Sequence, residues 1–211
     1  MSVVITADIV GSRELVDRAE AQRQIDAAVE RVERDAPAAT RPLRATVGDE
    51  LQGVYPDLAS ALCALTLLRL ALPEDVDLRF GVGIGEIGMI PSSAGELSEG
   101  PGWWAAREAI DTLHAKQVRA MPRVRTWISA APDAADAASL ALANSYAWAR
   151  DELISAMSGR ARRLSYGRCL GHTQAALARQ ERITQSAVSQ ILATAGASAV
   201  VEGYRALREN A

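Results

Sequence analysis

The chain has 211 residues, of which 49% are hydrophobic and 23% are charged. These values exclude wholesale disorder, and the length suffices for one medium domain and a small module. The most apolar run, residues 59–72, is too short to span a bilayer and contains Arg69, so we expect no membrane segment. The start of the chain lacks the features of a signal peptide, and the two cysteines have no partner at metal-ligand spacing. We therefore expect a cytoplasmic protein.

The charge is unevenly distributed along the chain, although the net charge is only −3. Residues 159–211 contain eight arginines and three glutamates, a net charge of +5, whereas the first 158 residues contain 15 basic and 23 acidic groups, a net charge of −8. A basic C-terminal segment suits contact with a phosphate backbone, but arginines also decorate solvated helices. Charge alone does not decide between these interpretations.

The first 130 residues predict strands and helices in alternation. Residues 2–8 are β-branched and predict a buried strand, and apolar residues at helical spacing from Leu15 predict a helix that ends before Pro37. The elements expected next are a hairpin over 43–47 and 51–55, a helix over 59–72, a strand with close backbone neighbours over 77–87, a helix over 101–118 and a strand over 123–129. The order βαββαβαβ predicts an α+β domain with helices against a mixed sheet.

The composition changes after this last strand. Residues 130–138 are rich in alanine, aspartate and proline, which is typical of a linker or a helix entrance. Helical periodicity then continues from Leu140 to the end of the chain. We therefore expect two domains, residues 1–130 and an all-α domain over residues 139–211.

Residues 173–192 have the pattern of a helix-turn-helix. Thr173 is placed to cap a short first helix and Thr184 to cap a second one, because threonine accepts a hydrogen bond from a backbone N–H of the first turn. Small Ala178 allows the two helices to cross closely. The side chains expected to fill the wedge between them are Ile183, Val188 and Ile191.

This stretch resembles the helix-turn-helix of many bacterial transcription regulators. That motif usually has glycine at the turn position of Arg182, and a left-handed arginine there costs about 1 kcal/mol. In such motifs the N-terminal residues of the second helix face the major groove, so the resemblance implies duplex DNA as a partner. The candidate DNA contacts are Thr173, Gln174, Arg182, Thr184, Gln185, Ser186, Ser189 and Gln190. A purely structural helix pair is the alternative.

Two aspartates mark a candidate site in the N-terminal domain. Asp8 ends a hydrophobic strand and Asp49 lies in the predicted hairpin turn, so both carboxylates can project from one edge of the sheet. Converging carboxylates are a standard means of holding Mg²⁺ beside nucleotide phosphates. Gly11 and Ser12 are placed to offer backbone amides to a phosphate. Alternatively, Asp8 caps the following helix and Asp49 only makes the turn.

Three segments, residues 8–12, 46–50 and 78–85, together resemble the signatures of class III nucleotidyl cyclase domains. The resemblance covers about residues 1–130 and implies a ferredoxin-like, cyclase-like fold. It also implies metal ligation by Asp8, Asp49 and the carbonyl of Ile9, and a phosphate loop at Gly11 and Ser12.

The same resemblance has departures on the later helix. Active cyclases carry a base-reading lysine before the Gly-Asp turn, whereas the sole lysine here is Lys116. They also carry Asn and Arg where this chain has Trp104 and Glu108. Arg107 is displaced by one position, about 100° around a helix, and is the remaining candidate phosphate contact. The resemblance implies that metal ligands are kept and cyclising groups are missing.

With the helix-turn-helix, these motifs resemble the SatD family over nearly the whole chain. We expect a DNA-binding transcriptional regulator whose cyclase-like domain binds a purine nucleotide with Mg²⁺ without cyclising it. A homodimer is expected for two reasons. Binding to two symmetric DNA half-sites calls for two copies of the chain, and the helix over 59–72 has more apolar surface than one core contact needs. The alternatives are an active nucleotide enzyme, either a divergent cyclase or a triphosphate hydrolase, and a vestigial dimerisation scaffold.

Overall fold

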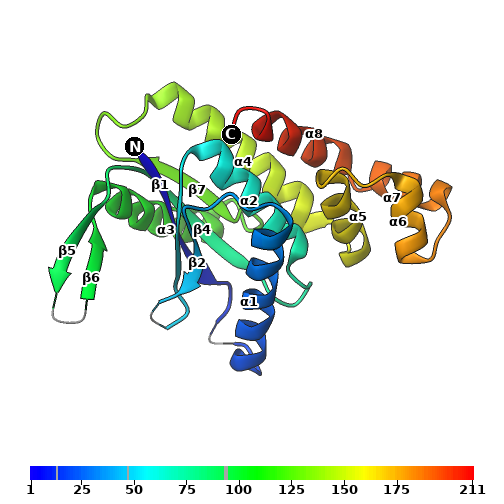
Figure 1. Cartoon of the computed structure of the whole chain (residues 1–211), viewed down its shortest axis with the longest axis horizontal. Helices are drawn as coiled ribbons and strands as arrows, with labels where there is room; N and C mark the ends of the chain where they lie inside the picture. Colours follow the sequence, from blue (N-terminus) through cyan, green and yellow to red (C-terminus); the bar gives the residue numbers. More distant parts are fainter. Residues whose placement is uncertain (13, 47, 93–94) are drawn as a thin grey trace.

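The computed structural model describes residues 1–12, 14–46, 48–92 and 95–211 (Figure 1). The strands are β1 (Ser2–Ile9), β2 (Arg41–Ala45), β3 (Leu51–Tyr55), β4 (Leu78–Gly85), β5 (Gly88–Ser92), β6 (Gly95–Glu99) and β7 (Thr126–Ala130). The helices are α1 (Arg18–Asp35), α2 (Leu58–Ala71), α3 (Pro101–Arg119), α4 (Ala137–Ala156), α5 (Gly159–Cys169), α6 (Gln174–Glu181), α7 (Gln185–Thr194) and α8 (Ala197–Arg208).

One sheet organises the N-terminal part of the chain. Strands β2, β3, β1 and β4 pair antiparallel in that order, and β7 joins the β4 edge as a parallel strand. The first six elements thus form the split βαβ pattern of ferredoxin-like folds. The predicted α+β class and mixed sheet are confirmed. Val47, the last residue of the predicted 43–47 strand, lies outside the described residues.

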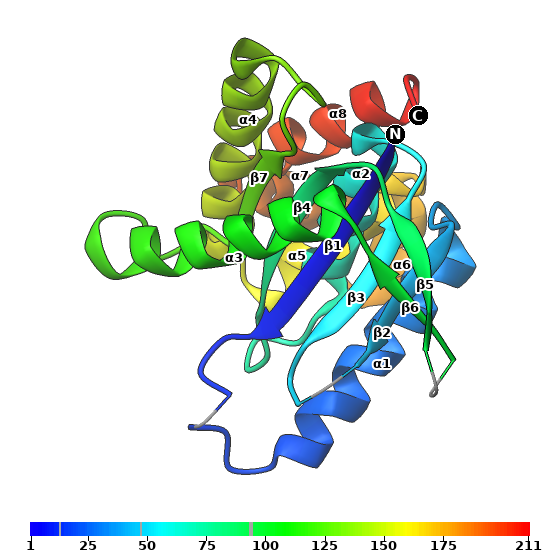
Figure 2. The ribbon, with the colours of Figure 1, turned by 90° about the vertical axis from the view of Figure 1, so that its left-hand side faces the viewer.

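A second, two-stranded sheet was not predicted. Strands β5 and β6 pair antiparallel and form a hairpin that stands beside the main sheet (Figures 1 and 2). Its base is fastened by Ser98, whose hydroxyl oxygen accepts hydrogen bonds from Arg41 at 2.9 Å and from the indole N–H of Trp103 at 2.8 Å. The hairpin is therefore anchored to both β2 and α3.

The side chains of strand β1 alternate between the sheet face covered by α1 and α2 and the face covered by α3. Val3, Ile5 and Ile9 belong to the large core cluster that includes α1 and α2, whereas Val4 packs with Ala106 of α3. Successive side chains of a strand point to opposite faces, so Asp8 shares the α3 face with Val4. Figure 2 shows α3 crossing in front of β1 and β4, with α2 behind the sheet.

The glycines of β4 allow α3 to lie directly on the strand backbone. A Cβ atom at Gly81 would stand 2.3 Å from the carbonyl oxygen of Ala106, and one at Gly83 would stand 2.1 Å from that of Gly102. No side chain fits into such a gap, because real Cβ contacts are well over 3 Å. The prediction of close backbone neighbours for the 77–87 strand is confirmed.

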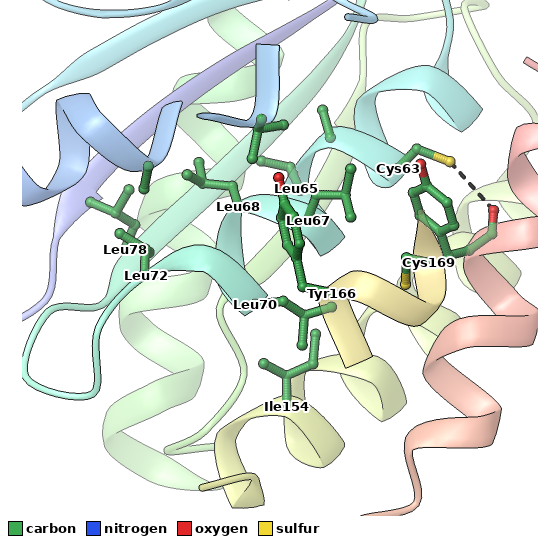
Figure 3. Packing of buried hydrophobic residues seen from close by; sticks show 14 of the residues in the cluster. Cys63, Leu65, Leu67, Leu68, Leu70, Leu72, Leu78, Ile154, Tyr166 and Cys169 are labelled. Atoms are coloured by element: carbon green, nitrogen blue, oxygen red, sulfur yellow. Dashed lines mark hydrogen bonds between the residues drawn. The ribbon is translucent and has the colours of Figure 1, made fainter. Parts of the chain in front are cut away.

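Helix α2 is buried on almost every side, as Figure 3 shows for its leucines. Side chains of α4, α5 and α8 join the cluster that α2 begins, among them Ile154 and Tyr166. The thiol of Cys63 donates to the carbonyl oxygen of Tyr204 at 3.6 Å, which ties α2 to α8. The expectation that α2 has apolar surface to spare for a second copy is therefore wrong, because this chain covers it.

One hydrophobic cluster thus contains residues from both expected domains. The division into residues 1–130 and 139–211 stays a prediction, as does the homodimer. No described helix combines the length and the apolar character needed to cross a bilayer.

A buried ion network fastens α4 to α2 and β7. Asp151 is fully buried and accepts from Arg69 at 2.9 Å and from Arg150 at 2.7 Å, and both arginines are only 2% exposed. Its second oxygen accepts from the backbone N–H of Arg125 at 2.8 Å. Burial alone raises the pKa of the Asp151 carboxyl, but Arg150 and Arg69 outweigh burial and hold that pKa below its usual range.

We predict that Asp151→Asn lowers the free energy of unfolding by about 3–5 kcal/mol, because it removes the buried carboxylate that neutralises Arg150 and leaves Arg69 with only the more distant Asp77, at 3.7 Å. Glu152→Gln is the matched control, since Glu152 and its partner Arg123 are exposed, and an exposed pair contributes about 1 kcal/mol at most. Urea denaturation of both variants measures the difference, and equal effects would contradict the role of the network.

We also predict that Gly83→Ala costs about 3 kcal/mol of stability or prevents folding, because its methyl group would overlap the backbone of α3. Gly88→Ala serves as the control, since the nearest atom to its Cβ is 3.8 Å away. Chemical denaturation compares the two. A Gly83→Ala protein as stable as the Gly88→Ala protein would show that α3 does not lie against β4.

Candidate functional site

The end of β1 and the β2–β3 turn lie side by side. Ala7 pairs with Leu51 in the antiparallel ladder, so Asp8 and the turn that contains Asp49 meet at one edge of the sheet. The predicted convergence of these two segments is therefore present. We call this edge the Asp8 corner, which comprises Asp8, Ser12, Asp49, Arg79 and His114.

Asp8 is held by two side chains that the sequence analysis did not assign. Its Oδ1 accepts from Nε of Arg79 at 2.7 Å, and its Oδ2 lies 2.9 Å from Nε2 of His114. Helix α1 is capped instead by Asp17, which accepts from the N–H of Glu20 at 2.9 Å. The alternative that Asp8 caps the following helix is therefore wrong.

The neighbours of His114 indicate which of its ring nitrogens donates. Nη1 of Arg79 lies 3.0 Å from Nδ1 of His114. Because a guanidinium group only donates hydrogen bonds, Nδ1 must accept, and the ring proton is on Nε2. In this arrangement Nε2 of His114 donates to Asp8. Gln117, one helical turn further along α3, accepts from the same Nη1 at 3.2 Å.

Asp49 is stabilised as an anion by its own neighbours. The hydroxyl of Ser12 donates to it and lowers the pKa of its carboxyl below the usual value, against a smaller effect of burial. The charges of Arg18 and Arg79 lower that pKa further. Ser12 was predicted to belong to a phosphate loop, and its hydroxyl here bonds to Asp49.

Arg107 reaches the same corner from α3. Its Nη2 forms an ion pair with Glu50, the residue after Asp49, and Glu50 also accepts from Gln52 at 2.8 Å. Gly11 follows β1 in the left-handed region, with a φ of 67°, where glycine is unstrained. The sequence-predicted residues Gly11, Ser12, Asp49 and Arg107 are therefore brought together, but each charged one already has a partner.

The predicted metal ligands do not fit a divalent ion held by Asp8. Both oxygens of this carboxylate accept hydrogen bonds, and one donor is a permanent cation. Ile9, whose carbonyl was the third predicted ligand, lies in the β1–β4 ladder opposite Leu78. Within residues 1–12, 14–46, 48–92 and 95–211, no group of three or more histidine, cysteine or acidic side chains is arranged for a metal.

The second candidate site is the helix pair α6–α7. Thr173 accepts from the N–H of Ala176 and Thr184 from that of Ala187, each at 3.1 Å, so both predicted N-caps are confirmed. Arg182 lies between the helices in the left-handed region, with φ 55° and ψ 46°. The chain turns there because the N–H of Ile183 bonds back to the carbonyl of Ala178 at 3.0 Å, as in a Schellman motif.

The two faces of α7 differ sharply. Val188 and Leu192 are buried against the core, as are Leu177 and Ala178 of α6. The polar residues predicted to contact DNA lie on the outside, where Thr173, Arg182, Thr184, Gln185, Ser186, Ser189 and Gln190 are exposed and Gln174 is half-buried. Gln174 and Ser189 line a small cleft of about 180 Å³ between α6, α7 and α8.

These elements define the class: an α+β protein with a ferredoxin-like sheet, an added parallel strand and a helical C-terminal segment. The model of the SatD family matches residues 2–201, so the chain belongs to this family. The resemblance seen in the motifs is confirmed.

Solved structures similar to this chain include a bacterial light-regulated adenylyl cyclase, with 11% identity, a TM-score of 0.45, and coverage of 60% of this chain and 74% of that one. The adenylyl cyclase CyaB from P. aeruginosa is similar at 15% identity and a TM-score of 0.39, over 53% of this chain and 71% of that one. No curated protein matches the sequence. Because both TM-scores lie below 0.5, the chemistry of the site rests on its own residues.

We predict that Ser12→Ala raises the pKa of the Asp49 carboxyl toward its usual value, because the lost hydroxyl donates to the charged form. Carbon-detected NMR titration of Asp49 measures this shift. Ser139→Ala is the matched control, since Ser139 lowers the pKa of Asp136 in the same way far from the corner. An unchanged Asp49 titration in Ser12→Ala would contradict the contact.

Proposed function

We propose that this protein binds duplex DNA through α6 and α7, with α7 as the recognition helix. The observation that carries the proposal is the outer surface of α7, where Thr184, Gln185, Ser186, Ser189 and Gln190 are all exposed while the opposite side is buried. Glutamine can bond both N6 and N7 of adenine, and serine and threonine suit base edges or phosphate. Thr184 also caps α7 and contacts the hydroxyl of Ser186, whereas Gln185, Ser189 and Gln190 make no side-chain hydrogen bond within the described part of the chain.

Arg182 supports the same proposal through its backbone. A non-glycine residue in the left-handed region costs about 1 kcal/mol, and glycine would remove that cost. The side chain is exposed at the turn that leads into α7, and an exposed guanidinium group at that turn suits a phosphate contact. A strained residue at a surface turn is a reason to infer function.

The helix pair is braced against α5 by charge. Arg163 forms two hydrogen bonds of 2.7 Å with the carboxylate of Glu181, and Arg160 lies 3.5 Å from the same group. Bidentate pairs of this kind fix geometry as well as charge. These contacts add to the core packing of Leu177 and Val188 in holding α6 and α7 against α5.

A purine nucleotide at the Asp8 corner is the second candidate function. It is supported by the meeting of the Gly11–Ser12 loop, the Asp49 turn and Arg107 at one edge of the sheet. Mg²⁺ bound by Asp8 is not part of this proposal, because Arg79 and His114 hold that carboxylate. The competing enzyme proposal is tested by incubating the protein with ATP or GTP and Mn²⁺, where any product would favour it.

For DNA binding we first select duplexes from a random-sequence pool with the full chain, then follow fluorescence anisotropy over a salt series. We expect Gln185→Ala to weaken binding to the selected duplex by roughly 10- to 100-fold, as the loss of a bidentate base contact does. Failure to enrich any sequence, together with binding that does not respond to salt, would contradict the proposal.

Arg182→Gly separates the backbone of the turn from its charge. We expect it to raise the free energy of unfolding by about 1 kcal/mol, because glycine is unstrained there. It should also reduce the slope of log affinity against log salt by about 1, the contribution of one phosphate contact. Arg23→Ala, on the exposed surface of α1, is the control and should leave the slope unchanged.

A further inference from the structure

We propose that the guanidinium group of Arg79 takes the place of a divalent cation at Asp8, so that the Asp8 corner is a site without a metal ion. An anionic ligand arriving there, such as the nucleotide of the second candidate function, is then recognised as the free anion and not as its metal complex. The binding of an anionic ligand at this corner rests on the proposed function. The exclusion of a metal ion from Asp8 rests on the geometry of the corner.

The ion pair between Asp8 and Arg79 is built by strand register. The two residues face each other directly in the antiparallel β1–β4 ladder, and such neighbours have Cβ atoms about 5 Å apart. Both side chains point to the α3 face, where Nε of Arg79 lies 2.7 Å from Oδ1 of Asp8. The pair therefore belongs to the sheet itself and does not depend on a loop.

Further contacts of Arg79 oppose its withdrawal. Its side chain is only 16% exposed, and Nη1 donates to both His114 and Gln117 of α3. Gln117 is itself held, since its amide donates to the carbonyl oxygen of Val124 at 2.6 Å. A metal ion that displaced Arg79 from Asp8 would have to break this connected set of hydrogen bonds.

A metal ion beside the undisturbed pair is also disfavoured. The remaining lone pairs of Asp8 are close to Arg79, so a divalent ion on them would be repelled by the guanidinium charge. Beside the corner, Arg107 pairs with Glu50, and the charges of Arg18 and Arg79 favour the anionic form of Asp49. Among the described residues, Asp8 is thus already paired with a cation and does not stand beside Asp49 as a free pair of carboxylates, which is the arrangement that attracts Mg²⁺.

The stability of the metal-free protein gives one test. If Asp8 and Asp49 formed an empty metal site, their two carboxylates would repel each other in EDTA. Asp8→Asn would then stabilise the protein. We expect the opposite, a melting temperature lower by several degrees, because Asp8→Asn loses the charge that holds Arg79. Asp75→Asn, an exposed loop carboxylate, is the control and should leave the melting temperature unchanged.

Direct titration gives the second test, with Mn²⁺ as the probe and the full chain in the calorimeter cell. We expect no stoichiometric binding to the wild-type protein at millimolar Mn²⁺. Binding of one or two ions that Asp8→Asn abolishes, or a higher melting temperature of Asp8→Asn in EDTA, would overturn the inference.

Nucleotide affinity tests separately whether an anionic ligand binds at the corner without a metal ion. We expect ATP or GTP to bind with equal affinity, within about twofold, in EDTA and in Mg²⁺. An affinity that is tenfold or more higher in Mg²⁺ than in EDTA would contradict recognition of the nucleotide as the free anion. If neither nucleotide binds under either condition, the second candidate function fails, and the Mn²⁺ titration still decides whether Asp8 holds a metal.

Discussion

The contact of α3 with the glycine-lined face of β4 is the constraint on which the Asp8 corner depends. Because Gly81 and Gly83 have no side chains, the helix backbone lies against the strand backbone. This close approach brings His114 within 2.9 Å of Asp8 and lets Arg107 reach Glu50. A larger residue in β4 would lift α3 and separate the charged groups that now neutralise one another.

A second constraint joins this sheet to the helices that follow it. Asp151 of α4 is bonded to Arg69 of α2 and to the backbone of Arg125 beside β7. At the other side of the junction, Tyr166 of α5 donates to Asp35 of α1 at 2.8 Å, with Arg31 stacked 4.1 Å from its ring centroid. The fully buried charges of Asp151 and Arg69 must stay paired, so they tie α4 to α2 in this arrangement.

Local signals in the sequence predicted most of the fold, because they act within a few residues. The N-caps Thr173 and Thr184 and the left-handed turn at Arg182 all depend on their immediate neighbours. The β5–β6 hairpin was missed because Pro91 argues against a strand, and its partner strand carries no strong apolar alternation. The apolar surface of α2 was assigned to a dimer because nothing local shows that α8, over a hundred residues later, covers it.

The sequence predicted where Asp8 and Asp49 lie, but it did not predict which side chains contact Asp8. Asp8 and Asp49 were brought to one edge by strand order, which the motifs indicated. Arg79, the cationic partner of Asp8, is 71 residues away, and the β1–β4 register is what places it opposite Asp8. The signal was nonetheless present, since Leu78, Arg79 and Phe80 alternate between apolar and basic, and a charge on the covered face of a central strand needs an opposite charge beside it.

The shared core also limits how the two candidate sites can influence each other. Helices α6 and α7 lie at the end of the molecule opposite the β5–β6 hairpin (Figure 1), and α5 fixes them to α2 through buried side chains such as Leu164 and Tyr166. A ligand that shifts an equilibrium must favour one of two arrangements, and well-packed cores resist gradual deformation. Any coupling between the Asp8 corner and α7 would have to pass through this packed junction, where Tyr166 of α5 donates to Asp35 of α1 and stacks on Arg31.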